Sequence, residues 1–219
     1  MHLNSELLFT KYAVPYFKSN FKVLEIGPSG VYQRIVNDNN IIWDTIDFEN
    51  TKFIEGSAEN LTHKLQSAYD FPIDDEVYDI VLSGQVIEHV EKIWTWLSEI
   101  KRITKKGGII ITINPVSWPY HEAPIDCWRI FPNGIHALAQ ETDMTVLMCM
   151  FESLEKEQIL AKDSKSKFIP GKSYNFLSSN RALHTKIIFN KIIRKIPRIN
   201  KFLEIPIEVA YDTISVLKK

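Results

Sequence analysis

The chain has 219 residues, 45% of them hydrophobic, which is enough to bury the core of one domain together with an elaboration. Its net charge of −1 at pH 7 excludes a whole-molecule attraction to nucleic acid, so we expect no nucleic-acid partner. Two cysteines give no disulfide framework, and neither an apolar leader nor a membrane-spanning run is present, so we expect a cytoplasmic protein.

The first part of the chain predicts a lead-in helix and then a buried strand. Residues 1–20 mix apolar and polar positions, and Pro15 should interrupt the helix. Residues 21–26 form an apolar run that predicts a strand, and Gly27-Pro28-Ser29-Gly30 stops it with a tight turn. Because glycine lets backbone N–H groups approach a ligand closely, we expect Gly27 and Gly30 to face a small molecule.

The next elements continue the alternation of helix and strand. A short helix over 31–37 leads to a strand over 41–47 that ends in Asp47. Asp47 falls 20 residues after Gly27, the spacing at which an acidic side chain can accept hydrogen bonds from ribose hydroxyls. A helix cap is the alternative role for this residue.

The middle of the chain predicts further strands and a long helix. We expect a third strand over 53–56, a helix-compatible segment to Gln66, a loop over 67–75, strands over 78–84 and 109–114, and a helix over 85–105. Lys105-Lys106-Gly107-Gly108 should end that helix, since cations suit its last turn and glycine suits the position beyond. Because strands and helices alternate, a doubly wound, mostly parallel α/β sheet is the expected fold.

An irregular segment over 115–129 follows the strand at 109–114. Its prolines exclude regular structure, while His121, Asp126 and Arg129 supply ionisable groups. Long loops at the carboxyl ends of sheet strands often carry function, although Asp126 and Arg129 can equally form a structural pair.

The last third of the chain differs in charge from the rest. Residues 1–151 carry 12 Lys and Arg against 20 Asp and Glu, whereas residues 152–219 carry 14 against 7. After a helix at 132–141 and a strand at 144–151, residues 182–202 form a basic amphipathic stretch. This stretch is either a helix that covers a core or one that rests on an anionic membrane surface from the inside of the cell.

Several of these segments together resemble class I S-adenosylmethionine-dependent methyltransferases. Residues 23–30 resemble the first motif of that family, Asp47 its ribose-binding acid, residues 83–90 the stretch after its fourth strand, and residues 99–108 the stretch that often ends in Pro-Gly-Gly. More narrowly, His121, Pro124, Asp126, Trp128 and Arg129 resemble a bacterial subgroup with His-x-x-Pro-x-Asp-x-Trp-Arg.

The resemblance implies a Rossmann-like, seven-stranded sheet whose last strand is antiparallel. Residues 1–20 would be the lead-in, 21–151 the cofactor-binding core, 152–210 a partly helical insertion that binds the acceptor or a surface, and 211–219 the closing strand. The cofactor-binding residues that it implies are Glu25, Gly27, Pro28, Ser29, Gly30, Asp47, Phe48, Ser67, Ala68, Ser83 and Gln85. Ser57 competes with Ser67 for the adenine contact, because neither matches the Asp that the family commonly has there.

The implied reaction is methyl transfer from S-adenosylmethionine to an acceptor, for which an oxygen of a glycan or a small metabolite is our prediction. His121 or His89 is suited to act as the base, Asp126 to orient a histidine and Arg129 to bind an anionic acceptor. No zinc-type ligand spacing appears, so no metal is expected. A non-catalytic binding protein on the same scaffold and an NAD-dependent oxidoreductase are the alternatives, and the oligomeric state stays open.

Overall fold

The computed structural model describes residues 3–48, 61–122, 124–171, 180–196 and 203–219. Seven strands form one sheet in the order β3-β2-β1-β4-β5-β9-β6. The strands are β1 (Lys22–Ile26), β2 (Ile42–Phe48), β3 (His63–Leu65), β4 (Tyr78–Gly84), β5 (Thr104–Pro115), β6 (Thr145–Glu152) and β9 (Asp212–Lys218). Strands β1 to β5 are parallel, whereas β9 runs antiparallel to both β5 and β6, which confirms the predicted doubly wound sheet with an antiparallel last strand.

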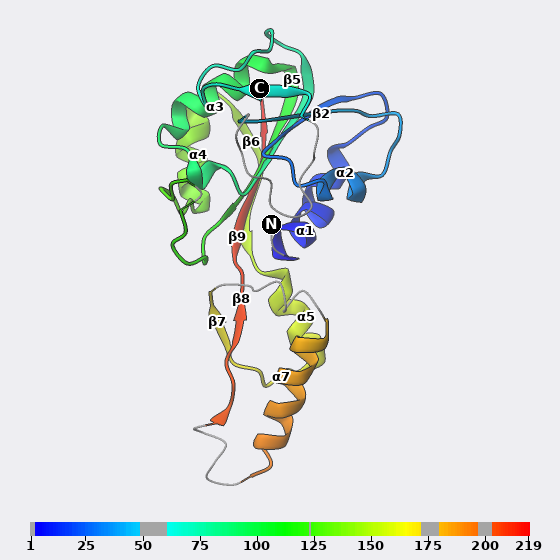
Figure 1. Cartoon of the computed structure of the whole chain (residues 1–219), viewed down its shortest axis with the longest axis vertical. Helices are drawn as coiled ribbons and strands as arrows, with labels where there is room; N and C mark the ends of the chain where they lie inside the picture. The colour runs from blue at the N-terminus through cyan, green and yellow to red at the C-terminus, as the bar shows by residue number, and fades with distance from the viewer. Residues whose placement is uncertain (1–2, 49–60, 123, 172–179, 197–202) are drawn as a thin grey trace.

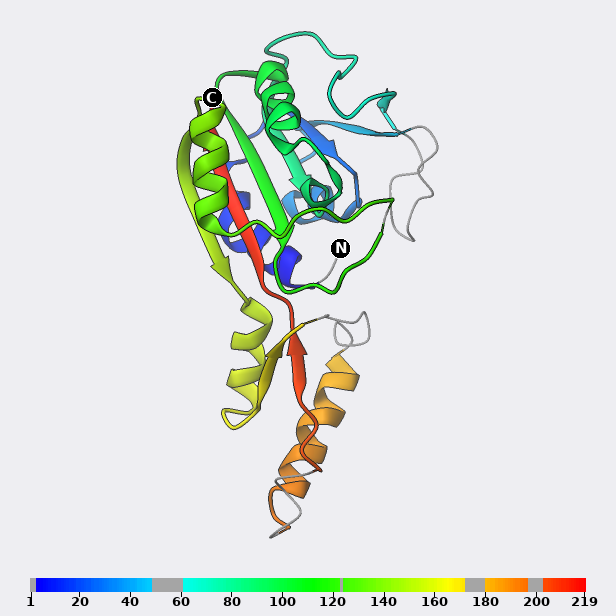
Figure 2. The same ribbon diagram turned by 90° about the vertical axis from the view of Figure 1, so that its left-hand side faces the viewer.

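Helices cover both faces of this sheet (Figures 1 and 2). Successive strand residues point to opposite faces, so Val23 and Ile80 pack in one core while Leu24 and Val81 pack in the other. The first core is closed by α1 (Leu3–Leu8), the turns η1 (Phe9–Ala13) and η2 (Val14–Tyr16), and α2 (Val31–Val36). The second is closed by α3 (Ile93–Ile103) and α4 (Pro132–Glu141). The lead-in therefore covers one face of the sheet.

The helix predicted over residues 85–105 is wrong at both ends. A short turn, η3 (Ile87–His89), comes first, and α3 begins only at Ile93, so His89 lies before the helix and not one turn into it. The segment Lys105-Lys106-Gly107-Gly108 belongs to β5 and does not cap the helix. The strand starts early because Thr104 pairs with Tyr78, and because the Lys105 ammonium binds the Asp79 carboxylate at 2.8 Å.

The third strand differs from its predicted place. Strand β3 lies at His63–Leu65, inside the segment expected to be helix-compatible, because residues 63–65 pair with the end of β2. Thr45 and Thr62 reinforce this pairing, since each hydroxyl accepts the backbone N–H of the other at 3.1 Å. The strand predicted at 53–56 and the candidate Ser57 lie outside the described residues.

The segment between β6 and β9 forms an extension that projects away from the sheet (Figures 1 and 2). It contains α5 (Leu154–Lys162), β7 (Phe168–Pro170), α7 (Asn180–Ile193) and β8 (Ile207–Val209), and β7 pairs with β8 in parallel. Ile159, Leu183, Ile187, Ile207 and Val209 give it a small core of its own. In the part of the chain that the structure describes, none of the helices combines the length and apolar character needed to cross a bilayer.

Candidate active site

The carboxyl ends of β1 to β5 meet at one edge of the sheet, and the loops at this edge carry the predicted site residues. The turn Gly27-Pro28-Ser29-Gly30 follows β1, and Gly27 and Gly30 have φ values of +64° and +69°, a backbone conformation that favours glycine. A Cβ atom at Gly27 would lie 2.6 Å from Cγ2 of Val86. The turn therefore keeps bare backbone at the edge where such sheets hold ligands.

The carboxylate of Glu25 fixes the shape of this turn. Glu25 is buried, and its Oε1 accepts hydrogen bonds from the Ser29 backbone N–H at 3.0 Å and from the Ser29 hydroxyl at 3.3 Å. Its Oε2 accepts the indole N–H of Trp43 at 3.0 Å. Burial raises the pKa of Glu25, while these hydrogen bonds stabilise the charged form. Glu25 thus holds the backbone of the turn in place from its buried position in β1.

The ends of β2 and β3 supply the other predicted cofactor residues. Asp47 and Phe48 end β2, and Asp47 Oδ1 accepts the N–H of Phe48 at 2.7 Å. Ser67 and Ala68 follow β3 at the same edge. The Ser67 hydroxyl accepts the N–H of Tyr69 at 3.1 Å, so it stabilises its own turn, and Ala68 packs against the sheet core.

The end of β4 is unusually tight. A Cβ atom at Gly84 would lie 2.2 Å from the Tyr32 hydroxyl, and Gln85 has φ of +61°, an uncommon conformation for a residue other than glycine. The Gln85 side-chain amide donates to the Ser5 hydroxyl at 3.0 Å and to Asp212 Oδ1 at 3.4 Å. Gln85 therefore ties the end of β4 to α1 and β9, while Ser83 is buried in β4.

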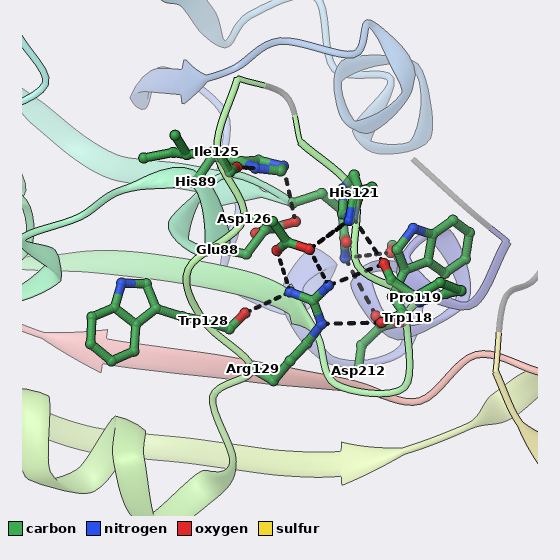
Figure 3. Close-up of polar contacts among 12 residues, drawn as sticks. Glu88, His89, Trp118, Pro119, His121, Ile125, Asp126, Trp128, Arg129 and Asp212 are labelled. Atoms are coloured by element: carbon green, nitrogen blue, oxygen red, sulfur yellow. Dashed lines mark hydrogen bonds and ion pairs between the residues drawn. The ribbon is translucent and has the colours of Figure 1, made fainter.

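The loop that follows β5 is organised around an Asp126–Arg129 pair (Figure 3). The guanidinium donates to Oδ1 at 2.5 Å and to Oδ2 at 2.7 Å, and Asp126 Oδ2 also accepts the backbone N–H of His121 at 2.8 Å. Arg129 further donates to the carbonyls of Trp118 and Pro119. Because of Arg129, the pKa of the Asp126 carboxyl lies at about 2. This ion pair has a structural role, because it orients the backbone that carries His121.

Trp128 and the neighbouring backbone attach this loop to the core. The Trp128 indole N–H donates to the Val90 carbonyl at 2.8 Å, and the Cys127 backbone N–H donates to the Glu88 carbonyl at 2.7 Å. At the end of the loop, the Asn114 amide donates to the Ile130 carbonyl at 2.9 Å. These bonds hold the loop against the η3 turn, so groups from both segments meet.

Three ionisable side chains meet where the loop crosses η3 (Figure 3). The rings of His89 and His121 lie 5.0 Å apart, nearly perpendicular, and His89 Nε2 is 3.7 Å from Glu88 Oε1. His121 Nδ1 lies 3.4 Å from Asp126 Oδ2. Burial raises the pKa of Glu88 to about 8 and lowers the pKa of His89, which favours the neutral form of both groups at neutral pH.

The structure thus collects the predicted residues into two groups at one edge. Glu25, Asp47 and the glycine turn lie at β1 and β2, while the four predicted catalytic residues lie around η3 and the loop after β5. Sequence reasoning missed Glu88 and Asp212, which are both buried at this edge. The signal for Glu88 was its position beside His89 in the stretch that resembled the family.

Residues 24–112 match a family model described as a methyltransferase domain. An uncharacterized methyltransferase of Schizosaccharomyces pombe is 39% identical over 51 residues, which are 23% of this chain and 18% of that protein. The chain therefore spans only about a fifth of the length of the curated relative that it matches.

Solved structures share the fold across nearly the whole chain. A SAM-dependent methyltransferase from Archaeoglobus fulgidus has a TM-score of 0.57 at 20% identity, with 98% of this chain and 92% of that chain covered. Phosphoethanolamine N-methyltransferase 2 of Haemonchus contortus, in complex with S-adenosyl-L-methionine, has a TM-score of 0.54 at 14% identity over 99% of this chain and 52% of that chain. The SpnF cyclase has a TM-score of 0.56 at 15% identity, with 98% and 80% covered.

The sheet topology is the Rossmann-like fold of these methyltransferases, and the match to the methyltransferase-domain model covers residues 24–112. Structures at this level of identity show the fold alone. One of them is described as a cyclase, so the fold by itself does not identify the reaction.

Proposed function

We propose that the protein is an S-adenosylmethionine-dependent methyltransferase that acts on an oxygen of a glycan or a small metabolite. One observation carries the proposal. The glycine turn after β1, the acid that ends β2, and a loop bearing ionisable groups lie at one edge of a sheet whose residues 24–112 match the methyltransferase-domain model.

The residues at β1 and β2 fit this cofactor. The turn at Gly27 and Gly30 offers bare backbone to the methionine end, and Glu25 holds that turn through Ser29. The Asp47 carboxylate would accept hydrogen bonds from the ribose hydroxyls. Ser67 and Ala68 would border the adenine, and Gln85 the reacting centre. When bound, S-adenosylmethionine supplies an electrophilic methyl group.

The loop after β5 would orient and activate the acceptor. His121 is 37% exposed, so an acceptor hydroxyl reaches it, and Asp126 holds its backbone N–H at 2.8 Å. In the simplest form His121 would take the proton of the acceptor hydroxyl, and the methyl–sulfur bond would break as the acceptor oxygen bonds the methyl carbon, which leaves S-adenosylhomocysteine. His89 would lie beside His121, and Arg129 would lie near an anionic acceptor. Positioning would supply most of the acceleration, since alignment alone can contribute about 7–11 kcal/mol.

The test is transfer of a tritiated methyl group from S-adenosylmethionine to deproteinised metabolite and glycan fractions. We expect labelled product with the wild type, much less with His121→Ala, and unchanged product with His136→Ala, an exposed histidine of α4. Full turnover by His121→Ala would remove the base assignment. Cofactor binding without transfer to any fraction would favour the alternative of a non-catalytic binding protein. Binding of NAD instead would favour an oxidoreductase.

We also propose that the extension contacts an anionic membrane surface through α7. Ile188 and Ile192 are each 56% exposed on this helix, and Lys191 and Lys195 are exposed beside them. Lysines also line a hollow of about 670 Å³ between α5 and α7, formed by Lys162, Lys165, Lys191 and Lys195 among others. Exposed apolar residues next to cations are typical of helices that lie in a membrane interface.

Co-sedimentation with liposomes tests this contact. We expect retention on phosphatidylglycerol vesicles, loss of retention in an Ile188→Ser/Ile192→Ser variant, and no effect of Ile42→Ser, an isoleucine of β2 that is 57% exposed. Absence of wild-type retention, or equal retention by all three proteins, would reject the membrane contact without affecting the proposed reaction.

A further inference from the structure

Glu88, His89 and His121 form a compact set of metal-ligand atoms. One carboxylate oxygen of Glu88 and one ring nitrogen of each histidine all lie within 4.8 Å of one another. The three residues come from two segments, since Glu88 and His89 lie in η3 and His121 lies in the loop after β5. The anchoring of that loop through Cys127 and Trp128 holds this arrangement in place.

Glu88 is the member of this set that most needs a partner. It is 1% exposed, and neither of its carboxylate oxygens has a hydrogen-bond partner within the described residues. A buried carboxylate without hydrogen bonds is costly, and proteins commonly resolve that cost by pairing the charge or by binding a metal ion. The nearby Arg129 guanidinium is already held by both oxygens of Asp126. A cation bound by Glu88 would therefore displace the proton of a neutral carboxyl, as metal ions do when they bind protonated ligands.

The hydrogen bonds of the histidines favour metal binding as well. His89 Nδ1 donates a hydrogen bond to the Ile125 carbonyl, because a carbonyl can only accept. His89 Nε2 therefore carries no proton, and it lies on the side of Glu88. His121 Nδ1 lies 3.2 Å from the Pro119 carbonyl and 3.4 Å from Asp126 Oδ2, which likewise leaves Nε2 with its lone pair. Histidines that bind metals usually donate their other ring N–H to a carbonyl or a carboxylate in this way.

We propose that Glu88, His89 and His121 bind one divalent transition-metal cation. Two imidazoles and one carboxylate suit Zn²⁺ and its neighbours better than Mg²⁺ or Ca²⁺, which prefer oxygen ligands throughout. Zinc bonds of about 2.0–2.2 Å place ligand atoms about 3.4 Å apart, so atoms that lie up to 4.8 Å apart need to approach by up to about 1.4 Å when the ion binds. His121 can make this movement because it lies on a loop and is partly exposed.

Three protein ligands leave a coordination position open, as in zinc sites that act on a substrate. If the proposed function holds, an oxygen of the acceptor would occupy that position, and the cation would lower the pKa of the acceptor hydroxyl. His121 would then bind the cation instead of taking the proton, and the acceptor hydroxyl would lose its proton to bulk water. This role rests on the proposed function, whereas the metal site does not.

Calorimetric titration of the untagged, EDTA-treated full chain with Zn²⁺ tests the site, and Co²⁺ absorption reports its ligands. We expect one tightly bound ion per chain, and visible Co²⁺ bands that change in Glu88→Gln and in His121→Ala. Each of these substitutions should weaken Zn²⁺ binding by more than about tenfold. His136→Ala is the control and should bind as the wild type does. Circular dichroism verifies that each variant is folded, and His121→Ala keeps the test valid where Glu88→Gln fails to fold.

Failure of the metal site and failure of the proposed function give different results. The metal site would be overturned if the wild type bound no Zn²⁺, or if both substitutions left Zn²⁺ binding unchanged. Either result would count even if S-adenosylhomocysteine binds. A single Zn²⁺ lost in both variants supports the metal site even if no methyl transfer is found.

Discussion

Replacing Asp126 with Asn tests how the loop after β5 is held. Asp126 is only 2% exposed, and its carboxylate receives two hydrogen bonds from Arg129 and one from the His121 backbone. Asn keeps the shape of the side chain, but it carries no negative charge and has only one oxygen that can accept a hydrogen bond from the guanidinium. A pKa lowered from the ordinary value of 3.8 to about 2 corresponds to a stabilisation of about 2 kcal/mol at neutral pH. We expect Asp126→Asn to lose about that much unfolding free energy.

Urea unfolding at pH 7 measures this loss, with Asp75→Asn as the control. Asp75 also pairs with an arginine, Arg102, at 2.7 Å, but it is 73% exposed, so its loss should cost less than about 1 kcal/mol. Because the folded-state pKa of Asp126 is depressed, its contribution is complete above about pH 4 and is lost as the pH falls toward 2. The difference between wild type and Asp126→Asn should shrink over that range. Equal, small losses for the two variants at pH 7 would refute the reasoning.

Three further substitutions test the turn after β1, a buried hydroxyl and an ion pair of α3. Gly27→Ala combines a positive φ with a Cβ atom 2.6 Å from Val86, so we expect a stability loss of about 1–2 kcal/mol and weaker S-adenosylhomocysteine binding by calorimetry; unchanged binding would contradict the role of the turn. Tyr32→Phe removes a buried hydroxyl that has no partner within the described residues, so thermal unfolding should show equal or higher stability. Arg102→Met leaves the largely buried Glu99 carboxylate without its 2.6 Å partner, and urea unfolding should show a loss of about 2–3 kcal/mol.

Much of the fold was predictable because its strands are short apolar runs separated by turn residues. The helix at 132–141 was correct to the residue, since Pro132 marks its first turn. The helix over 85–105 was wrong because apolar spacing alone does not show that η3 must turn before α3 begins. Cations and glycines at 105–108 are typical of a helix end, but Thr104 and Ile109 on either side of them pair with β4, which places the segment in a strand. Such pairing depends on residues far away in the sequence.

The candidate site was predictable where its residues lie at the ends of strands, as Asp47 does in β2, or directly after them, as Gly27 does after β1. Glu88 could not be identified as a candidate from the sequence. What distinguishes it is that its carboxylate is buried without a hydrogen-bond partner within the described residues, and a single sequence does not reveal burial or partners. Asp212 was also missed, since its contacts come from Asn4 at 2.7 Å and from Gln85, both more than 120 residues away. The set of metal-ligand atoms could not be predicted from the sequence. Glu88 and His89 are adjacent and His121 lies 32 residues further on, which is not a familiar ligand spacing.

Calorimetric titration with S-adenosylhomocysteine measures cofactor binding at the ends of β1 and β2, with NAD as the comparison ligand and Asp47→Ala as the comparison protein. We expect one molecule bound per wild-type chain with micromolar affinity, loss of that binding in Asp47→Ala, and no heat from NAD. The same titration with and without Zn²⁺ separates cofactor binding from the proposed metal site. Binding of NAD by the wild type, or equal binding of S-adenosylhomocysteine by the wild type and Asp47→Ala, would show that this edge of the sheet is not the proposed cofactor site.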